Sequence, residues 1–214
     1  MLARGKAILA GVLAIAVGGG CVAIHVEQRA DMPIAAARIQ AVRTPVTVEG
    51  VVTVAPGTFD EGFAVQDASG GIYVARAIAA GVKAGDRVRI SGAIAVLHGQ
   101  ATIEPAQIET LGAGSPPAPL EIRTGTVGPA TEGRIVTVRG KVAGDVIDDQ
   151  PWGWKLYLDD GSGPVLVFIS TPAGIDIRNI RSGLALRATG FNGRYDKHTE
   201  VLPRSPGDIT AAAR

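Results

Sequence analysis

The sequence predicts an all-β protein made of two small closed barrels of five strands each, arranged in tandem. One pattern occurs twice in the 214 residues: Val46–Val52 reads VTVEGVV and Val136–Val142 reads VTVRGKV, which indicates two copies of one unit. Each copy continues with apolar runs on either side of an Asp-x-Ser-Gly turn, as in a β-hairpin. Because aromatic residues make up only 4% of the chain, both cores must consist mainly of Val, Ile, Leu and Ala, which favours strands.

The N-terminal segment differs from the rest of the chain. Arg4 and Lys6 precede Ala7–Ile24, eighteen residues without a charge, and this order is typical of a secretory signal or an N-terminal anchor. Eighteen apolar residues lie near the lower limit for a helix that crosses a bilayer, and the positive-inside rule places Arg4 and Lys6 in the cytoplasm. We therefore expect a hydrophobic helix in residues 1–26, with the two barrels held outside the cytoplasm in the cell envelope.

Cys21 is the only cysteine, so a disulfide within the chain is excluded. Its position at the end of the apolar run resembles the lipid-modified cysteine of bacterial lipoproteins, although Gly18 stands where an aliphatic residue is expected. Three alternatives stay open for this segment: an uncleaved anchor, a lipoprotein attached through Cys21, and a cleaved signal that releases a secreted protein.

Composition divides the remainder of the chain. A spacer with a short helical piece precedes the first barrel, and a Pro- and Gly-rich linker, GAGSPPAP, separates the two barrels. A frayed tail follows the second barrel. The expected ranges are 27–43 for the spacer, with its helical piece around Ala35–Val42, 44–111 for the first barrel, 112–119 for the linker, 120–209 for the second barrel and 210–214 for the tail.

Alternation of apolar residues assigns the faces of the central hairpin in each copy. The inward set is Phe63, Val65, Ile72 and Val74 in the first copy and Leu156, Leu158, Val165 and Val167 in the second. The outward set includes Ala64, Gln66 and Tyr73 in the first copy and Lys155, Tyr157 and Phe168 in the second.

The matched Asp67 and Asp160 begin the two tight turns. A carboxylate at this position accepts backbone N–H groups, and the glycines that follow allow positive φ. We therefore interpret both aspartates as turn residues rather than as catalytic or metal-binding groups.

These residues resemble a known family. A strand ending in Asp-x-Ser-Gly-Gly-Ile-Tyr-Val, followed by Val-x-x-Gly-Asp-x-Val-x-Ile-x-Gly, is similar to the OB-fold nucleic-acid-binding domains of bacterial exported proteins, which often accompany secreted nucleases. The second copy resembles the companion domain that follows them. The resemblance covers roughly residues 44–209 and implies two tandem OB-type barrels. No nuclease module accompanies them in this sequence.

In an OB barrel the usual ligand surface is the outer face of the second and third strands, flanked by two loops. Aromatic side chains beside cations on such a surface suit single strands, because bases stack on the rings and the backbone meets the charges. The second copy offers more of these residues than the first. The candidate nucleic-acid-binding residues are Trp152, Trp154, Lys155, Tyr157, Phe168, Arg194, Tyr195 and Lys197 in the second copy and Tyr73 in the first.

A structural interpretation of the same residues stays open. Trp152 and Trp154 could cap the end of the barrel, and Tyr157 with Phe168 could form a cross-strand pair. The chain carries 21 basic and 20 acidic residues, without the basic excess that is usual in non-specific nucleic-acid binders. Four acidic residues also lie near the candidate residues and would repel phosphate: Asp148, Asp149, Asp159 and Asp196.

The sequence offers little for catalysis. The three histidines, His25, His98 and His198, are scattered, and the sole cysteine lies in the apolar segment, which argues against a Cys-His metal cluster or a nucleophile–base pair. No glycine-rich phosphate loop follows a strand. We therefore expect no enzyme activity, no catalytic or metal-binding residues and no cofactor.

Two functions remain. The first is an exported or membrane-tethered protein that binds single-stranded DNA through its second domain. The alternative is an envelope scaffold or adaptor whose barrels bind protein or glycan partners. The sequence leaves the oligomeric state open.

Overall fold

The computed structural model describes residues 12–17, 20–25, 31–76 and 81–212, which fall into two units, Met1–Asp31 and Met32–Arg214. In the first unit, β1 (Val12–Val17) and β2 (Gly20–His25) form an antiparallel hairpin with Val12 opposite His25. Cys21 lies within β2.

The expected N-terminal helix is wrong for the described part of this segment. The run is rich in β-branched Val and Ile, which favour strands, and it contains the three consecutive glycines Gly18–Gly20, which weaken a helix. Among the described residues no helix is long and apolar enough to span a membrane. Arg4 and Lys6 lie outside the described residues.

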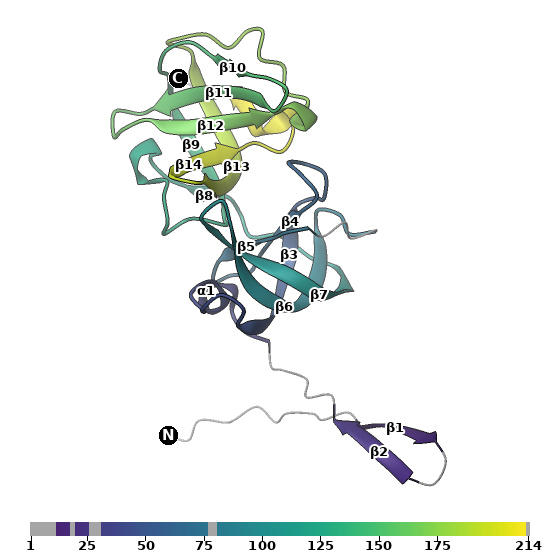
Figure 1. Ribbon diagram of the computed structural model, residues 1–214. Coiled ribbons are helices and arrows are strands. Elements are labelled where there is room, and N and C mark those ends of the chain that lie inside the picture. The colour runs from purple at the N-terminus through teal and green to yellow at the C-terminus, as the bar shows by residue number, and fades with distance from the viewer. Residues whose placement is uncertain (1–11, 18–19, 26–30, 77–80, 213–214) are drawn as a thin grey trace. The chain divides into compact units, whose positions relative to one another are not determined.

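Strands of the first copy close into a barrel in the order β3-β4-β5-β7-β6 (Figure 1). Neighbouring strands are antiparallel except β5 and β7, which run parallel. The strands are β3 (Pro45–Val54), β4 (Phe63–Gln66), β5 (Gly71–Val74), β6 (Asp86–Leu97) and β7 (Gln100–Ala113).

The second copy repeats this order. Its strands run β9-β11-β12-β14-β13, with β12 parallel to β14, and the barrel closes because Leu158 of β11 lies opposite Val142 of β9. The prediction of two tandem five-stranded OB-type barrels is confirmed. The strands are β9 (Ile135–Val142), β11 (Gly153–Asp159), β12 (Val165–Ser170), β13 (Ala185–Tyr195) and β14 (His198–Leu202).

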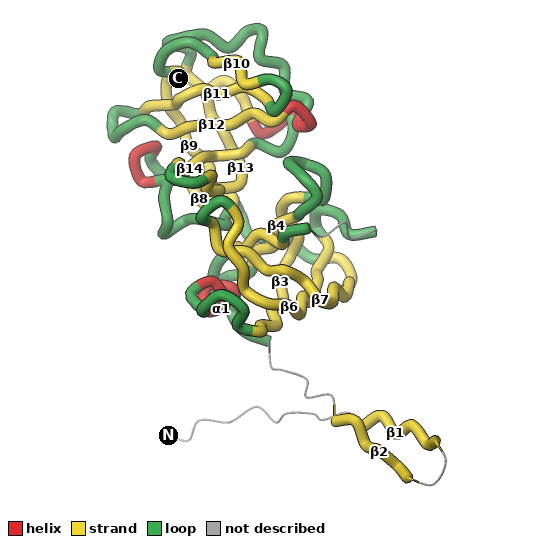
Figure 2. The backbone as a smooth tube through the Cα atoms, in the orientation of Figure 1, coloured by secondary structure: helices red, strands yellow, loops and turns green. Residues whose placement is uncertain are grey.

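Short elements extend the second barrel, and Figure 2 shows how little helix the two barrels contain. One of the short strands, β15, pairs with β13 over part of the expected frayed tail. The short strands are β8 (Leu120–Glu121), β10 (Ile147–Asp149) and β15 (Ile209–Ala211). The 3-10 helices are η1 (Thr124–Thr126), η2 (Thr171–Ala173) and η3 (Pro206–Asp208).

Each barrel has its own aliphatic core. All eight residues of the predicted inward set are buried, from Phe63 and Leu156 at 0% exposed to Val165 at 5%. They belong to two separate clusters, one in each barrel. The inward parity predicted for both hairpins is therefore confirmed.

A short helix, α1 (Ile34–Arg38), covers one side of the first barrel (Figure 1). Ile34 and Ala37 are fully buried and join the core of this barrel. Residues 32–37 of the expected spacer therefore pack on the barrel instead of only connecting it, whereas Ile39 and Val42 are exposed.

The repeated turn fixes this helix in place. The Asp67 carboxylate accepts hydrogen bonds from the turn at Ser69 N and Gly70 N, at 2.7 and 2.8 Å, and from Ile34 N at 2.9 Å. The Ser69 hydroxyl accepts a further bond from Ala35 N at 3.0 Å. These bonds satisfy N–H groups in the first turn of α1 that have no acceptor within the helix.

The Asp-x-Ser-Gly turn of the second copy makes equivalent hydrogen bonds. The Asp160 carboxylate accepts from Ser162 N and from the Thr124 hydroxyl, both at 2.9 Å, and the Ser162 hydroxyl accepts from Gly125 N at 2.9 Å. The hydrogen bonds to Asp160, led by that from the Ser162 hydroxyl, hold the pKa of this carboxyl well below its usual range. Both aspartates are turn residues, as predicted, and each turn also binds the helical segment that precedes its barrel.

A third apolar cluster lies between the two barrels. It joins Ala64 and Tyr73 from the outward set of the first barrel to Ile135, Phe191 and Leu202 of the second. Tyr73 is therefore only 6% exposed, and the expectation that it lies on an open face is wrong, because the second barrel covers that face.

Polar contacts reinforce this interface. Gln66 is 3% exposed, and its side-chain oxygen accepts a hydrogen bond from Ile135 N at 3.0 Å. Arg38 of α1 forms an ion pair of 2.7 Å with the buried Glu132. Arg204 donates to the Thr53 carbonyl at 3.0 Å. These bonds join β4, α1 and β3 of the first barrel to the second barrel.

Candidate ligand-binding cleft

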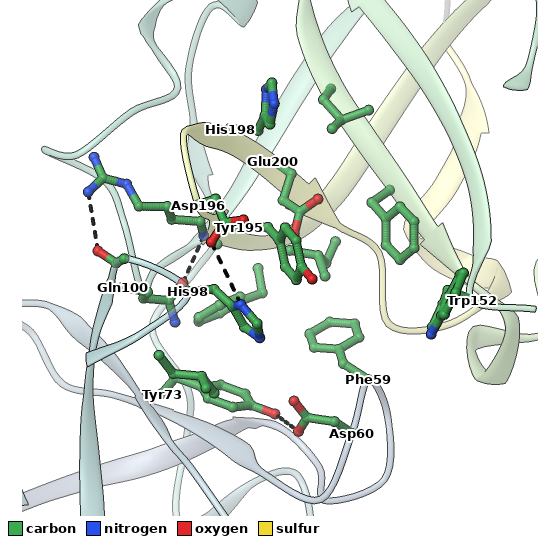
Figure 3. A pocket seen from close by; sticks show the side chains of 18 of the residues that line it. Phe59, Asp60, Tyr73, His98, Gln100, Trp152, Tyr195, Asp196, His198 and Glu200 are labelled. Carbon is green, nitrogen blue, oxygen red and sulfur yellow. Dashed lines mark hydrogen bonds and ion pairs between the residues drawn. The ribbon is translucent and has the colours of Figure 1, made fainter. Parts of the chain in front are cut away.

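A cleft of about 1190 Å³ lies where the two barrels meet (Figure 3). One wall is the outer face of β11, β12, β14 and β13 in the second barrel. The other wall comes from the first barrel, through the β3–β4 loop, β5 and the β6–β7 turn. The cleft therefore includes the second barrel's share of the surface on which OB-type barrels bind ligands.

Aromatic side chains are concentrated in this cleft. The chain has four Phe, three Tyr and two Trp, and six of these nine residues line the cleft. They range from Trp152 and Tyr195, at 68% and 52% exposed, to Phe191 at 3%. The cleft therefore offers both accessible rings and a buried aromatic end. The six are Phe59, Tyr73, Trp152, Phe168, Phe191 and Tyr195.

The buried end is an aromatic group from both barrels. The Phe191 ring lies 6.3 Å from that of Phe59 and 5.8 Å from that of Tyr73, measured between centroids. The Tyr73 hydroxyl donates to Asp60, and burial together with this carboxylate raises the pKa of Tyr73 far above its usual value. Tyr73 is therefore a neutral hydrogen-bond donor at the base of the cleft.

Two hairpin turns meet at the opposite end. The rings of His98, from the β6–β7 turn, and Tyr195, from β13, stack with centroids 4.3 Å apart (Figure 3). Asp196 N donates to the His98 carbonyl at 2.7 Å, and Arg194 N donates to the Gln100 side chain at 2.8 Å. Each barrel thus supplies one half of this end of the cleft.

The cations of the cleft are mostly engaged with the protein. Lys155 Nζ lies 2.7 Å from a carboxylate oxygen of Asp149 and 6.0 Å from the centre of the Phe168 ring. Arg194 donates to the Gly99 carbonyl at 3.2 Å and lies 3.6 Å from Glu132. Lys197 is exposed and has no ion-pair partner among the described residues. It is the cation best placed to meet an external anion.

Glu200 projects from β14 into the cleft and is only 9% exposed (Figure 3). Within the described part of the chain its carboxyl has no hydrogen bond or ion pair, and its oxygens are not among the fully buried side-chain atoms that lack a partner. Burial raises the pKa of Glu200 to about 7, although the nearby Lys155 ammonium acts in the opposite direction. The Glu200 carboxyl oxygens therefore face the cleft without a hydrogen-bond donor from the described part of the protein.

Seven of the nine candidate residues line this cleft. The other two do not. Trp154 packs against the core of the second barrel because it shares the inward parity of Leu156. Tyr157 is 36% exposed on β11, outside the residues that line the cleft. The seven are Tyr73, Trp152, Lys155, Phe168, Arg194, Tyr195 and Lys197.

The structural interpretation of these residues holds for Trp154 but not for Trp152, nor for a pair of Tyr157 with Phe168. Trp154 packs as the structural interpretation expected, whereas Trp152 is exposed in the cleft. The strand register places Leu166 opposite Tyr157 and Lys155 opposite Phe168. Tyr157 and Phe168 are therefore not a directly opposed pair.

Several lining residues were missed at the sequence level, above all Glu200 and Phe191. In β14 every second residue lines the cleft: His198, Glu200 and Leu202 do so, and they alternate with Thr199 and Val201, which do not. This two-residue period was visible in the sequence and could have identified Glu200. Within the described residues no group of three or more His, Cys, Asp or Glu side chains could hold a metal ion.

The fold and the cleft define a tandem OB-type barrel protein with an aromatic cleft between its barrels. No protein-family model matches the sequence, and no curated protein matches it.

Solved structures give weak matches of 14–15% sequence identity. A murine DNA-binding protein bound to double-stranded DNA matches with a TM-score of 0.40, covering 78% of this chain and 97% of its own. The tetrameric p202 HIN2 matches with 0.36, covering 80% and 94%. The single-stranded DNA-binding protein from Thermus aquaticus matches with 0.28, covering 81% and 95%. At these TM-scores the matches assign no function to this chain.

Proposed function

We propose that this protein binds single-stranded nucleic acid, in the first place single-stranded DNA, in the cleft between its barrels. The observation that carries the proposal is the gathering of six of the nine aromatic residues around the outer face of the second barrel. Stacking on such rings contributes about 1–3 kcal/mol per base and tolerates any sequence. Bases in a duplex are already stacked on each other, so an unpaired strand is the better ligand.

The accessible rings lie where a strand can reach them. Trp152 is the most exposed aromatic residue of the cleft, and Tyr195 presents a ring that is already stacked on His98. Phe168 lies beside Lys155, so a base on this ring would have an ammonium close to its phosphate. Lys197, at the β13–β14 turn, supplies a second cation.

The charge of the cleft favours a second candidate. Four carboxylates line it against three Lys and Arg side chains in the described residues, and two of these cations already have acidic partners. A neutral glycan stacks on aromatic rings and avoids repulsion from carboxylates, and OB-type barrels also bind oligosaccharides. The second candidate is therefore an envelope scaffold or adaptor that holds a glycan or protein partner. The carboxylates are Asp60, Asp149, Asp196 and Glu200.

Fluorescence titration of the full chain separates the two candidates, with Trp152 as the reporter. Short oligodeoxynucleotides at low salt should quench the emission to saturation. The salt dependence should be shallow, because few cations are free to contact phosphate, each contributing a slope of about −0.7 on single strands. If a neutral oligosaccharide quenches the folded protein and oligodeoxynucleotides do not, the nucleic-acid proposal is wrong and the second candidate replaces it.

We also propose that the protein is exported from a bacterial cell and held at the membrane. Support comes from the basic residues Arg4 and Lys6 before the uncharged run Ala7–Ile24, and from the family resemblance. Lipid attachment at Cys21 and release after cleavage are the alternatives. Cell fractionation, with fatty-acid labelling of the natural protein and of Cys21→Ser, distinguishes them. Recovery only from the cytosol would contradict export.

A further inference from the structure

Glu200 is a largely buried residue whose carboxyl has no protein partner within the described residues. The residue is nine-tenths buried and lines the cleft, and its carboxyl has no hydrogen bond or ion pair within the described residues. Burying a polar group without a partner costs free energy, and buried polar groups are nearly always hydrogen-bonded. A ligand that supplies donors to this carboxyl would remove the cost, which marks Glu200 as a recognition group.

We propose that Glu200 selects guanine, by accepting hydrogen bonds from the N1–H and N2–H groups of a base inserted into the cleft. This inference rests on the proposed binding of single strands and adds a base preference to it. A carboxylate only accepts hydrogen bonds, through two oxygens side by side. Guanine presents two adjacent donors on its pairing edge, and bonds from both to one carboxylate are charge-assisted.

The other bases fit this acceptor pair less well. Adenine and cytosine each present one amino donor beside a ring nitrogen that accepts, so that nitrogen would face a carboxylate oxygen. Thymine presents one N–H between two carbonyl oxygens. In each case an acceptor atom of the base faces a carboxylate oxygen of Glu200. This repulsion weakens the binding of the other bases, in addition to the hydrogen bonds that strengthen the binding of guanine.

The surroundings of Glu200 suit a flat aromatic ligand. In the strand register Glu200 lies opposite Gly193 on β13 and Leu166 on β12. Gly193 adds no side chain above the sheet, and a Cβ there would press on Leu202 at 2.9 Å and Phe191 at 3.3 Å. The sheet surface beside the Glu200 carboxyl therefore carries no side chain at Gly193, which leaves space for a flat ligand between the aromatic rings of the cleft.

A cationic ligand is the other partner that a buried carboxyl could take. Lys155 is close enough to stabilise the charged form of Glu200, so a second cation at this place would be repelled by its ammonium group. The neutral donors of guanine avoid that repulsion. A base edge therefore fits better than an amine or a guanidinium group.

The test uses the full chain and oligothymidine strands that carry one different central base. A single guanine should bind about tenfold or more tightly than thymine, since bonds to a charged group are lost with thymine. Hypoxanthine, which lacks the N2 amino group, should lose most of this gain. The analogue 7-deazaguanine, whose pairing edge is unchanged, should keep it. Fluorescence anisotropy measures all of these strands.

Glu200→Gln should remove the guanine preference, so that strands with a central guanine and plain oligothymidine bind this variant with equal affinity. Glu61→Gln is the matched control, because Glu61 is an exposed residue of the β3–β4 loop that does not line the cleft, and it should keep the preference. The base-analogue series on the natural chain decides the question even if Glu200→Gln does not fold.

Two failures are distinguishable. If oligothymidine binds and the central base makes no difference, the guanine inference is wrong while the proposed function stands. If the folded protein binds none of these strands, the proposed function itself is wrong.

Discussion

Glu200 makes the stability of the protein depend on pH. Its carboxyl has a pKa of about 7 in the folded chain against 4.5 in an unfolded one. Between these values the folded state binds more protons, so the free energy of unfolding falls as pH rises from about 4.5 to 7. Above pH 7 the cost of the buried charge is on the order of 3 kcal/mol.

Glu200→Gln should remove this dependence, because an amide stays neutral. We expect the variant and the natural chain to be about equally stable at pH 4, and the variant to be more stable at pH 8 by on the order of 3 kcal/mol. Urea denaturation of both proteins at the two pH values measures the difference. Parallel pH profiles would show that Glu200 is not the group responsible.

The two tryptophans should have opposite roles although they are two residues apart. Trp152 is 68% exposed in the cleft, so Trp152→Ala should weaken oligonucleotide binding by about 1–3 kcal/mol and change stability by less than about 0.5 kcal/mol. Trp154 packs on the barrel core, so Trp154→Ala should destabilise the fold by about 2 kcal/mol or more. Binding titrations and urea denaturation of both variants test this contrast. The reverse pattern would mean that the places of Trp152 in the cleft and of Trp154 on the barrel core are misassigned.

Among the elements, the repeated Asp-x-Ser-Gly turn holds a helical segment against each barrel. Asp67→Ala removes the acceptor for Ile34 N and for two turn N–H groups. We expect a loss of about 2 kcal/mol in stability and faster hydrogen exchange at the Ile34 and Ala35 amides. Exchange measured by NMR provides the test. Unchanged exchange at both amides would show that the turn does not hold α1.

Strand periodicity predicted the barrels but not what covers them. Alternation showed correctly that Ala64, Gln66 and Tyr73 point away from the core of their own barrel. It could not show that another barrel buries them, because that contact joins residues more than sixty positions apart. Hydropathy similarly predicted an apolar segment at residues 7–24 but did not distinguish strand from helix, since short apolar runs fit both.

At the scale of the whole molecule, two glycines allow the barrels to dock. Gly71 of the first barrel and Gly133 before the second approach so closely that a Cβ on either would overlap the carbonyl of the other. Gly71→Ala should therefore loosen the interface and weaken binding in the cleft, while both barrel cores stay folded. Faster hydrogen exchange at the Ile135 amide, which donates to Gln66, reports the loosening.

Gly128→Ala is the control for this prediction. No other atom lies within 4 Å of a Cβ at Gly128, so this variant should leave the interface and the cleft unchanged. Equal exchange at Ile135 in both variants and the natural chain would contradict the role of the Gly71–Gly133 contact.

The cleft shows the same limit of sequence reasoning. The outer face of the second barrel was predictable because Lys155 and Phe168 alternate with core residues and Tyr195 lies next to a turn, at the end of β13. The opposite wall was not, because Phe59 and His98 join it only when the barrels dock. Trp154 was misassigned because it was read with its loop, whereas its parity with Leu156 directs it to the core.

Photo-crosslinking tests the central claim most directly. Oligothymidine carrying 5-bromouracil is bound to the full chain, irradiated, and the crosslinked residues are identified by mass spectrometry. Crosslinks at Trp152, Tyr195 or Phe168, competed by unmodified single strands and not by duplex, are the predicted result. Absence of crosslinks to the folded protein, or crosslinks confined to residues outside the cleft such as Tyr157, would contradict it.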